Sequence, residues 1–517
     1  MLAFIRPVFM LTTVLAATLT LGGCALPPPD SRVASQVLSP AQTAETSLGR
    51  AVQARLKDRP DGVSGIYPLE DSLDAFTARA MLAEGADKTL DVQYYIWADD
   101  TTGRLLLKAL REAAERGVRV RLLLDDNGIA GLDTSLAALN AHANIEVRLF
   151  NPFPVRRPKW IGYLWEFPRL NHRMHNKSFT ADSQASIIGG RNVADEYFGA
   201  NRQSQFADLD VLALGPAARQ VGEDFDRYWA STSAYPVDQL LPAVETPQAV
   251  LDETLAPPED GPDTQQYLEA LEQSDFLQRL LDKSLAMTWA HVSVISDDPE
   301  KALGKGQDER LMSRQLSAAL DQPRASVTLV SPYFVPTESG VALFGELEAQ
   351  GVEVTVLTNS LAANDVAFVH AGYAKYRKPL LKADVTLYEM QRTASTGNKR
   401  PRAGVMGSSA SSLHAKTFAI DGEVLFIGSF NFDPRSTNIN TEIGFLIESP
   451  KLATEMTDSF AEEVPQSAYE LALENGDVRW IERHNGEQIR HDHEPETGPF
   501  KRFWVSLLSF LPLEPLL

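Results

Sequence analysis

Cysteine is nearly absent from this chain of 517 residues, in which Cys24 is the only one. Without a second cysteine no disulfide can form within the chain, so the fold depends on packed apolar cores. Hydrophobic residues make up 44% of the sequence, which is enough to build such cores. Because single cores stop growing beyond about 250–300 residues, a chain of this length is expected to form two domains or more.

Positive charge is also in short supply. The chain has 48 lysines and arginines against 69 aspartates and glutamates, which gives a formal net charge of −21. A broad nucleic-acid surface needs a basic footprint to neutralise phosphates, so no nucleic-acid partner is expected. The same deficit disfavours electrostatic adhesion to anionic lipids, so attachment to a membrane would need another kind of anchor.

The N-terminal residues have the pattern of such an anchor. Residues 8–21 form an apolar stretch that is short for a membrane-spanning helix and typical of a secretory signal peptide. Residues 21–24, Leu-Gly-Gly-Cys, resemble a bacterial lipobox, whose cysteine becomes lipidated. We therefore predict a signal peptide over 1–23, lipidation of Cys24 and a flexible tether over 24–60, with an uncleaved signal anchor as the alternative.

The residue after this cysteine bears on the location of the protein. Ala25 stands there instead of an aspartate. By similarity to the sorting of enterobacterial lipoproteins, this favours the outer membrane over the inner membrane. We expect a lipid-anchored protein of the bacterial cell envelope that faces the periplasm. The sequence does not indicate an oligomeric state.

The motif His-x-Lys-x-x-x-x-Asp occurs twice in the chain, at positions 239 residues apart. The six motif residues are His175, Lys177, Asp182, His414, Lys416 and Asp421. A glycine-led turn follows each motif and ends in an asparagine, Asn192 or Asn431, 17 residues after the histidine. Two copies with the same internal spacing indicate a duplicated unit.

The predicted helices and strands repeat in the same order. In the first half, the residue pattern predicts strands over 89–97, 118–124 and 145–150 and helices over 73–84, 102–116 and 134–141. In the second half, it predicts strands over 326–330, 352–357 and 385–389 and helices over 312–320, 341–350 and 365–383. Such alternation predicts an α/β fold in which each domain is a mixed, largely parallel sheet flanked by helices.

We place the two domains at residues 61–235 and 301–517. Between them, the proline-containing stretch 236–300 is predicted to be a linker with helices, and the helix over 264–290 is expected to pack on the second domain. The C-terminal residues 500–517 are rich in Phe, Trp and Leu. We interpret them as a docked terminal segment rather than a membrane-interface helix, because apolar helical stripes more often belong to a core.

The motif residues suit phosphate chemistry. A histidine and a lysine two positions apart project from the same face of a strand. The ammonium group neutralises the non-bridging oxygens of a phosphate while the imidazole reaches phosphorus. Two histidines together can split a phosphodiester, since one attacks phosphorus and the other handles the proton of the leaving group. A single motif is usually a solvated strand pair, and the matched second copy is what favours an active site.

These motifs resemble the two catalytic motifs of the phospholipase D superfamily, and the resemblance extends over residues 428–436. Further segments are similar to bacterial cardiolipin synthases, in particular to their C-type branch: 91–97, 147–153, 173–179, 189–193, 440–443 and the C-terminal Leu-Pro-Leu-Glu-Pro-Leu-Leu. The similarity covers roughly residues 60–517. It implies two duplicated phospholipase D-like domains with one active site shared between them.

The resemblance also implies roles for single residues. His175 attacks phosphorus and forms a phosphohistidine, while His414 protonates the departing alcohol and deprotonates the incoming one. The groups that hold the phosphate oxygens are Lys177, Lys416, Asn192 and Asn431. These groups supply the positive charge that a metal ion brings to other phosphoryl sites, so no metal and no cofactor is expected.

A catalytic histidine also needs a carboxylate that orients it. Glu442 fits that family role, and Asp208 is its counterpart in the first half, where Asp210 competes for the assignment. The motif aspartates Asp182 and Asp421 are interpreted as supports of the hairpin and not as proton carriers.

Three functions remain. The first is a phosphatidyl transferase that makes cardiolipin from phosphatidylglycerol and a second phospholipid. The second is a phosphodiesterase of the same fold, which uses water as the acceptor and hydrolyses phospholipid or, less in keeping with the acidic charge, nucleic acid. The third is a non-enzymatic lipoprotein with a relic site, which the complete motifs disfavour. The resemblance favours the transferase, with phospholipids as substrates.

Overall fold

The structure is a computed structural model, and it describes residues 26, 35–201, 205–256, 262–273, 279, 284–306, 308–320, 323–364, 366–392, 412–484, 486–511 and 514. The predicted signal peptide and Cys24 lie outside the described residues. None of the helices in this described part is both long enough and apolar enough to cross a membrane.

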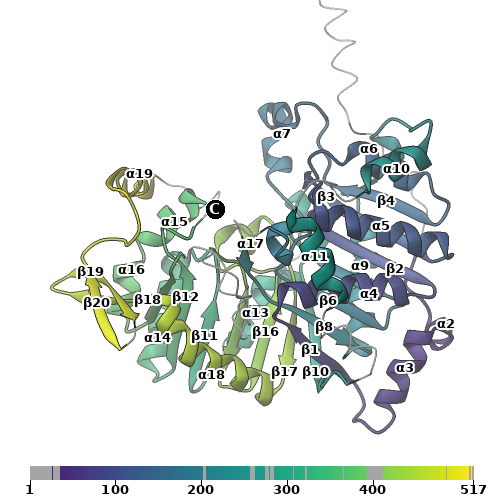
Figure 1. The fold of residues 1–517 in the computed structure, drawn as a ribbon. Coiled ribbons are helices and arrows are strands. Elements are labelled where there is room, and N and C mark those ends of the chain that lie inside the picture. The colour runs from purple at the N-terminus through teal and green to yellow at the C-terminus, as the bar shows by residue number, and fades with distance from the viewer. Residues whose placement is uncertain are drawn as a thin grey trace, which may run out of the picture.

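A single sheet of 18 strands runs through both halves of the molecule (Figure 1). In the first half the strands follow one another across the sheet in the order β9 (Ala234–Pro236), β4 (Ile145–Phe150), β3 (Arg119–Gly128), β2 (Thr89–Ile96), β5 (Ser178–Ala181), β6 (Ala185–Gly189), β8 (Asp210–Leu214) and β1 (Val63–Leu69).

The second half continues the same sheet in mirrored order. Its strands are β10 (Thr288–Ser296), β17 (Ile443–Glu448), β16 (Val424–Gly428), β15 (Thr417–Ile420), β11 (Ser326–Val330), β12 (Glu353–Asn359), β13 (Thr386–Met390), β18 (Ala468–Glu474), β19 (Asp477–His484) and β20 (Glu487–His491). The halves meet where β1 and β10 pair antiparallel, with Val63 opposite His291 and Ile66 opposite Thr288. The predicted duplication is therefore confirmed.

The sheet is mixed, as predicted, but it is less parallel than expected. Only β2, β3 and β4 in the first half, and β11, β12 and β13 in the second, pair in parallel within it. The other neighbours pair antiparallel because each motif forms a hairpin, β5–β6 or β15–β16, that joins the parallel strands to the rest of the sheet. A hairpin can join antiparallel strands with a short turn, whereas parallel strands need a crossover.

Helices cover both faces of the sheet. In the first half, α4 (Ser72–Gly85) and α5 (Thr101–Glu115) pack on one face and α9 (Pro216–Ala230) packs on the other. In the second half, α13 (Met312–Leu320) and α14 (Thr337–Ala349) share one face and α18 (Pro450–Ser467) covers the other. Helix α6 (Asp133–Asn140) precedes β4. These cores are apolar on both sides, which is the usual arrangement of an α/β sheet.

Shorter elements complete the described chain. They are α2 (Pro40–Ala44), α3 (Ser47–Leu56), the 3-10 helix η3 (Lys159–Gly162), α7 (Tyr163–Leu170), α8 (Asp195–Phe198), β7 (Phe206–Ala207), η4 (Val237–Gln239), α10 (Pro247–Thr254), α11 (Pro262–Glu272), η5 (Pro299–Leu303), η6 (Asp308–Arg310), α15 (Ala367–Ala374), α16 (Arg377–Lys382), β14 (Ser412–Leu413), α17 (Pro434–Asn438) and α19 (Pro499–Ser509).

Three stretches differ from the prediction. The tether predicted over 24–60 contains α2 and α3, which begin at side-chain caps on Ser39 and Thr46. The long helix predicted over 365–383 is divided into α15 and α16, and Pro379 lies in the first turn of α16, where a missing N–H costs no hydrogen bond.

The helix predicted over 264–290 is the third difference. Helix α11 ends at Glu272, and Thr288 already begins β10. Tyr267 of α11 packs edge-on against Phe76 of α4, with ring centroids 5.7 Å apart. The helix therefore packs on the first half instead of the second, and the sheet of the second half begins at β10, before residue 301.

Candidate active site

Each His-x-Lys-x-x-x-x-Asp motif leads into one of the two hairpins. His175 and His414 stand three residues before β5 and β15, and the motif aspartates stand in the turns that follow these strands. Asp182 and Asp421 adopt left-handed backbone angles, with φ of 49° and 54°. Aspartate tolerates this conformation better than most residues, which suits it to the tight turn.

The motif aspartates bind backbone amides far along the strand from the histidines. The Asp182 carboxylate accepts hydrogen bonds from the amides of Asp87, Lys88 and Thr89 at 2.8–2.9 Å. Asp421 accepts equivalent bonds from residues 324–326. Burial raises the pKa of Asp421, but these amides outweigh burial and hold it below its ordinary value. These contacts fit the structural support that we expected of the motif aspartates.

Each histidine segment lies against a segment of the opposite half. The amide of His175 donates to the carbonyl of Thr441 at 2.8 Å, and the amide of His414 donates to the carbonyl of Ala207 at 2.7 Å. Strands β14 and β7 extend the second of these contacts as a short parallel pair. Both histidines are thereby fixed at the boundary between the halves.

The carboxylates predicted to orient the histidines reach them across this boundary. Glu442 Oε2 lies 2.8 Å from His175 Nδ1, and Asp208 Oδ2 lies 2.6 Å from His414 Nδ1. Each pair joins a histidine of one half to a carboxylate of the other. The competitor Asp210 instead forms an ion pair with Arg79 at 2.7 Å.

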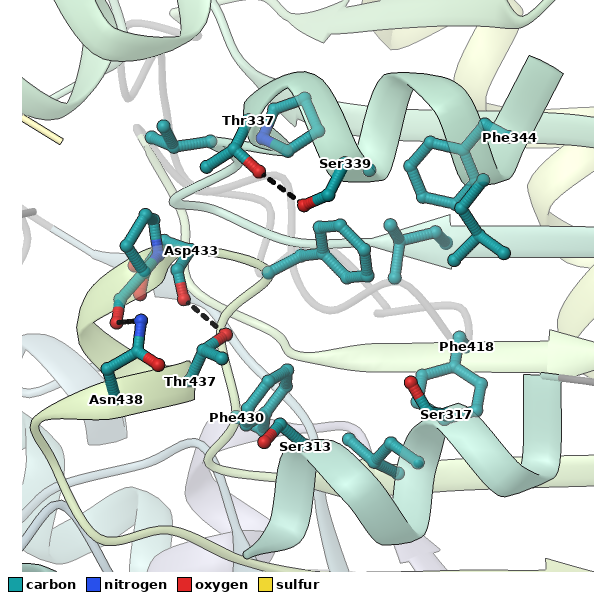
Figure 2. Close-up of a pocket in the computed structure, with 18 of the residues that line it drawn as sticks. Ser313, Ser317, Thr337, Ser339, Phe344, Phe418, Phe430, Asp433, Thr437 and Asn438 are labelled. Carbon is teal, nitrogen blue, oxygen red and sulfur yellow. Dashed lines mark hydrogen bonds between the residues drawn. The ribbon is translucent and has the colours of Figure 1, made fainter. Parts of the chain in front are cut away.

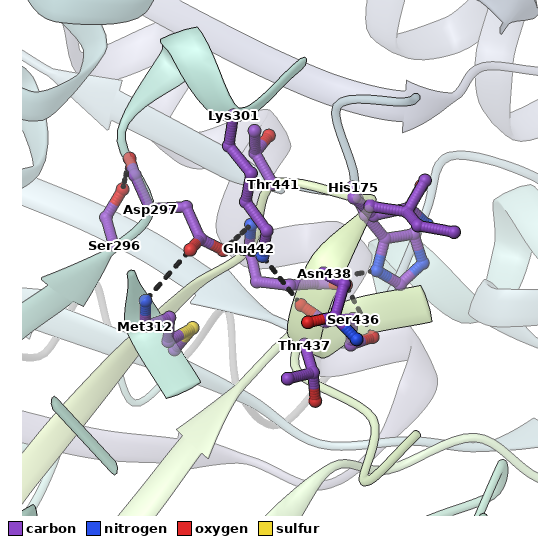
Figure 3. A network of polar contacts seen from close by, with 12 residues as sticks. His175, Ser296, Asp297, Lys301, Met312, Ser436, Thr437, Asn438, Thr441 and Glu442 are labelled. Atoms are coloured by element: carbon purple, nitrogen blue, oxygen red, sulfur yellow. Dashed lines mark hydrogen bonds and ion pairs between the residues drawn. The ribbon is translucent and has the colours of Figure 1, made fainter. Parts of the chain in front are cut away.

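Glu442 is itself held by a polar network (Figure 3). The hydroxyls of Ser429 and Ser436 donate to its two carboxylate oxygens at 2.5 and 2.8 Å. Behind them, Asp297 accepts the backbone amide of Glu442 at 3.0 Å and pairs with Lys301 at 3.0 Å. Burial raises the pKa of Asp297 to about 6, in spite of the neighbouring lysine. The network fixes the position of the Glu442 carboxylate.

Sequence reasoning missed most of this support. Ser429 and Ser436 lie within the segment 428–436 that carries the family resemblance, but no role was assigned to them. Asp297 follows β10, in a stretch where we predicted a helix and a linker. The alternation of buried Ala290 and Val292 with exposed His291 and Ser293 is the strand pattern that could have revealed it.

The two lysines lie beside the histidines and are almost fully buried. Lys177 Nζ donates to the carbonyl of His175 at 2.6 Å, and Lys416 Nζ lies 3.0 Å from His414 Nδ1. Burial lowers the pKa of Lys177 to about 7. Each lysine also lowers the pKa of the histidine of the other half, as expected for four groups that lie near one another.

The two asparagines differ in their present partners. Asn192 donates through Nδ2 to the Tyr197 hydroxyl at 3.0 Å and accepts the amide of Ile96 at 3.2 Å. Asn431 is also buried, and its Oδ1 has no hydrogen-bond partner among the described residues. An unpaired buried amide oxygen is uncommon and marks a position where a ligand or a water can bind.

Burial decides the charge of the histidines. It lowers the pKa of His175 to about 4 and that of His414 to about 3, although the paired carboxylates act in the opposite direction. Both imidazoles are therefore neutral near pH 7. Each Nδ1 faces a carboxylate, and a proton on Nδ1 would donate to that carboxylate and leave the lone pair of Nε2 free. Aromatic rings complete the walls, with Tyr95 5.1 Å from His175 and Tyr197 5.1 Å from His414 between ring centroids.

Other histidines belong to different parts of the structure. His370 is buried, and its Nε2 lies 3.1 Å from Glu494 Oε1, beside Arg377. His491 pairs with Glu482. His172 lies at the boundary between the halves, where its Nδ1 is 3.0 Å from the carbonyl of Ile439.

A pocket of about 640 Å³ lies next to the second motif turn, between α13 and α14 (Figure 2). Phe430 and Phe432, on either side of Asn431, contribute to its wall. Figure 2 shows Phe344 and Phe418 at one end and Thr337, Ser339 and Asp433 at the other. Ser317 lies beside Phe418, so the lining of the pocket is mixed in polarity.

A duplicated α/β sheet with two histidine–carboxylate pairs and two buried lysines at its centre defines an enzyme of the phospholipase D superfamily. The family model described as "Cardiolipin synthase, PLD-like domain" matches residues 81–229 and 316–464, so the chain belongs to this family.

Curated relatives span nearly all of the chain. Cardiolipin synthase C of Escherichia coli (strain K12) is 49% identical over 471 residues, which cover 91% of this chain and 99% of that protein. An uncharacterized protein of Helicobacter pylori (strain ATCC 700392 / 26695) is 32% identical, over 90% of this chain and 92% of its own length. Cardiolipin synthase A of Pseudomonas entomophila (strain L48) is 27% identical, over 78% and 68%.

Among solved structures, the phosphatidylserine synthase of Haemophilus influenzae Rd KW20 has a similar fold. The TM-score is 0.54, the sequence identity is 14%, and the match covers 82% of this chain and 91% of that one. At this identity the likeness concerns the fold alone.

Proposed function

We propose that this enzyme is a phosphatidyl transferase that makes cardiolipin from phosphatidylglycerol and a second phospholipid. The observation that carries the proposal is the pair of crossed contacts, Glu442 on His175 and Asp208 on His414, which assemble one phosphodiester site from both halves. The names of the curated relatives supply the product, cardiolipin.

In the first step, Nε2 of His175 attacks phosphorus of the donor lipid. A nitrogen–phosphorus bond forms, the bond from phosphorus to the head-group oxygen breaks, and His414 gives a proton to that oxygen. In the empty site, the positive charges of Lys177 and Lys416 contribute to the low pKa of His414. A bound phosphodiester anion offsets these charges. Binding of the donor thus favours the protonated His414 that the step requires.

In the second step, the glycerol hydroxyl of phosphatidylglycerol replaces the departed head group. His414 is neutral after the first step, so it can take the proton of this hydroxyl. The hydroxyl oxygen then attacks the phosphorus of the phosphohistidine. The nitrogen–phosphorus bond breaks and cardiolipin leaves. Lys177 and Lys416 stabilise the equatorial oxygens in both steps, and Asn431 offers an amide for the same purpose.

The decisive experiment is a lipid assay with purified protein. Labelled phosphatidylglycerol, with and without phosphatidylethanolamine, should give cardiolipin. Formation of phosphatidic acid alone would mean that water is the acceptor, and the hydrolase would replace the transferase. His175→Ala and His414→Ala should each abolish turnover, because the two histidines act as one unit. Substantial activity in either variant would contradict the two-histidine mechanism.

Attachment through Cys24 is part of the proposal. A lipidated Cys24 would hold the enzyme on the periplasmic side of the envelope, with the outer membrane favoured by Ala25. We expect incorporation of labelled palmitate into the wild type and none into Cys24→Ser. Label in the variant would contradict lipidation at this residue.

A further inference from the structure

Two exposed aromatic surfaces stand out on the described part of the molecule. The first surface, here the α7 surface, consists of Trp160, Leu164, Trp165 and Phe167, on η3 and α7. Trp160 is 62% exposed and Leu164 is 73% exposed. The second, here the α19 surface, consists of Phe500, Phe503, Trp504, Leu507, Phe510 and Leu511. Large apolar side chains gathered in this way mark a binding surface.

The α19 helix docks on the fold by a narrow contact. Val505 is its buried residue and packs with Leu361 and Ala371. Lys501 Nζ donates to the carbonyl of Leu361 at 2.6 Å. The aromatic side chains of the helix are exposed, and Trp504 has ring contacts with Phe500 and Phe503. Helix α19 is docked through Val505, as predicted for the terminal segment, but its exposed apolar side chains favour the membrane-interface alternative that the sequence analysis had set aside.

Both surfaces lie at the end of the sheet where β4 and β12 finish, which is also the end that carries the histidines. Helix α7 is followed within five residues by His175, and Asn151, next after β4, binds the carbonyl of Arg169 at 2.9 Å. Helix α19 rests on Leu361, two residues after β12 ends at Asn359. Asn359 in turn bonds the amide of Leu413, next to His414, at 3.0 Å.

Figure 1 shows the same placement at the scale of the molecule. Helices α7 and α19 project along its upper edge, one from each half, while the junction of β1 and β10 lies at the lower edge. A flat partner that approached this side of the molecule could reach both helices at once.

The composition of the surfaces indicates which partner that is. Tryptophan, phenylalanine and leucine beside lysine and arginine are typical of helices that lie in a membrane interface. Arg157 and Lys501 are exposed next to the two surfaces, on a chain of net charge −21. Basic residues beside exposed apolar side chains suit anionic lipid head groups.

We infer that the α7 and α19 surfaces are two interfacial anchors that seat the active-site edge on a phospholipid bilayer. They hold the histidines at the depth of the lipid phosphates. The lipid as substrate rests on the proposed function, whereas the contact with the bilayer does not depend on it. A lipidated Cys24 would tether the protein near the membrane, but only these surfaces would orient the site towards it.

Tryptophan fluorescence tests the contact without reference to activity. The full-length protein is mixed with vesicles of phosphatidylglycerol and phosphatidylethanolamine whose acyl chains carry bromine, a quencher. Trp97, Trp229 and Trp480 are buried, and Trp289 is half-buried at the junction of β1 and β10, away from both surfaces. The difference in quenching between the wild type and the variant therefore reports on the three exposed tryptophans. We expect clear quenching in the wild type and its loss in the triple variant Trp160→Phe, Trp165→Phe, Trp504→Phe.

Absence of quenching in the wild type, or quenching that the triple variant retains, would overturn the inference. If the wild type is not quenched and its mass in solution doubles, the surfaces bind a second copy of the chain, which also overturns it. The N-terminal lipid is present in both proteins and cannot by itself bring these tryptophans into the acyl region.

An activity assay separates this inference from the proposed function. The variant Leu164→Ser, Phe503→Ser, Phe510→Ser should lose about tenfold or more of its activity on vesicles, because it lacks apolar contacts with the bilayer. It should keep its activity on short-chain phosphatidylglycerol dissolved as monomers. Ile489→Ser, an exposed apolar residue on β20, is the matched control and should lose neither.

Equal loss on both substrates would contradict the inference. If the wild type makes no cardiolipin from either substrate, the proposed function fails, and the fluorescence result alone decides whether the surfaces bind a membrane.

Discussion

At His175, burial and the carboxylate of Glu442 act in opposite directions on the pKa of the imidazole, and burial prevails. The same balance holds at His414 with Asp208. The carboxylates therefore do not serve to charge the histidines in the empty site. We propose that they hold the proton on Nδ1 and present Nε2 to the substrate, which is the role of the aspartate in other histidine-dependent enzymes.

Replacement of either carboxylate tests this assignment. In Glu442→Gln and Asp208→Asn the shape is kept, but the amide can hold the imidazole in the wrong tautomer. We expect kcat to fall by about 10²–10⁴-fold in each variant, with a smaller change in KM. The assay is cardiolipin formation at saturating phosphatidylglycerol. Activity within a factor of two of wild type in either variant would mean that the contact is not catalytic.

Asp182→Asn is the matched comparison, because it also replaces a buried carboxylate of the site region. Asp182 accepts three backbone amides and touches neither histidine. We expect a loss of about 2 kcal/mol in the free energy of unfolding, as charge-assisted hydrogen bonds weaken. The protein that remains folded should turn over at close to the wild-type kcat. A selective loss of kcat without loss of stability would give this residue a chemical role.

The depressed histidine pKa values also predict how stability depends on pH. Between pH 6.5 and about 4, an unfolded histidine binds a proton that folded His175 does not. The free energy of unfolding should therefore fall as pH decreases through this range, by up to about 1.4 kcal/mol per pH unit for each such histidine. Urea unfolding from pH 7 to pH 4 measures the slope. His175→Asn should flatten it, and an unchanged slope would contradict the assigned burial effect.

Among the elements, those with strong local signals were the ones that the sequence predicted well. Strand β4 and helix α13 lie where predicted, since each has a clear period of two or 3.6. Helix α11 and strand β10 were merged into one helix because the linker between them has no strong boundary signal. The division between α15 and α16 was missed because Pro379 was not treated as a restart of the helix.

The site was predictable in its members but not in its connections. The family resemblance singled out Glu442 and Asp208, yet it gave no indication that each would reach the histidine of the other half. That pairing depends on contacts between distant segments, such as β7 with β14. Such contacts are set by how the halves meet at β1 and β10, and no local pattern encodes them.

The turn after β6 depends on a close approach. A Cβ at Gly190 would lie 2.0 Å from Asp208 Oδ1, so any side chain there must push this carboxylate away from His414. We expect Gly190→Ala to lower kcat by about tenfold or more, since small displacements of catalytic groups are costly. Gly85→Ala, at the end of α4 with open space around it, is the control and should leave kcat unchanged. Equal activity of both variants would show that the turn adapts.

For the molecule as a whole, the continuous sheet fixes which groups share a site. The strands β1 and β10 join the halves within one chain, and both crossed pairs span that same boundary. One chain thus contains one complete site, and each half contributes a histidine, a lysine and the carboxylate that serves its partner. The duplication supplies two similar halves, but chemistry requires both.

This arrangement predicts the outcome of mixing inactive variants. His175→Ala and His414→Ala proteins each lack one histidine, and a site shared within one chain cannot be repaired by a second chain. A mixture of the two should therefore remain inactive, even after joint unfolding and refolding, in the cardiolipin assay. Wild-type protein carried through the same cycle shows whether refolding succeeds. Recovery of a substantial part of the wild-type activity would mean that two chains exchange halves, and that the site belongs to a dimer instead of a single chain.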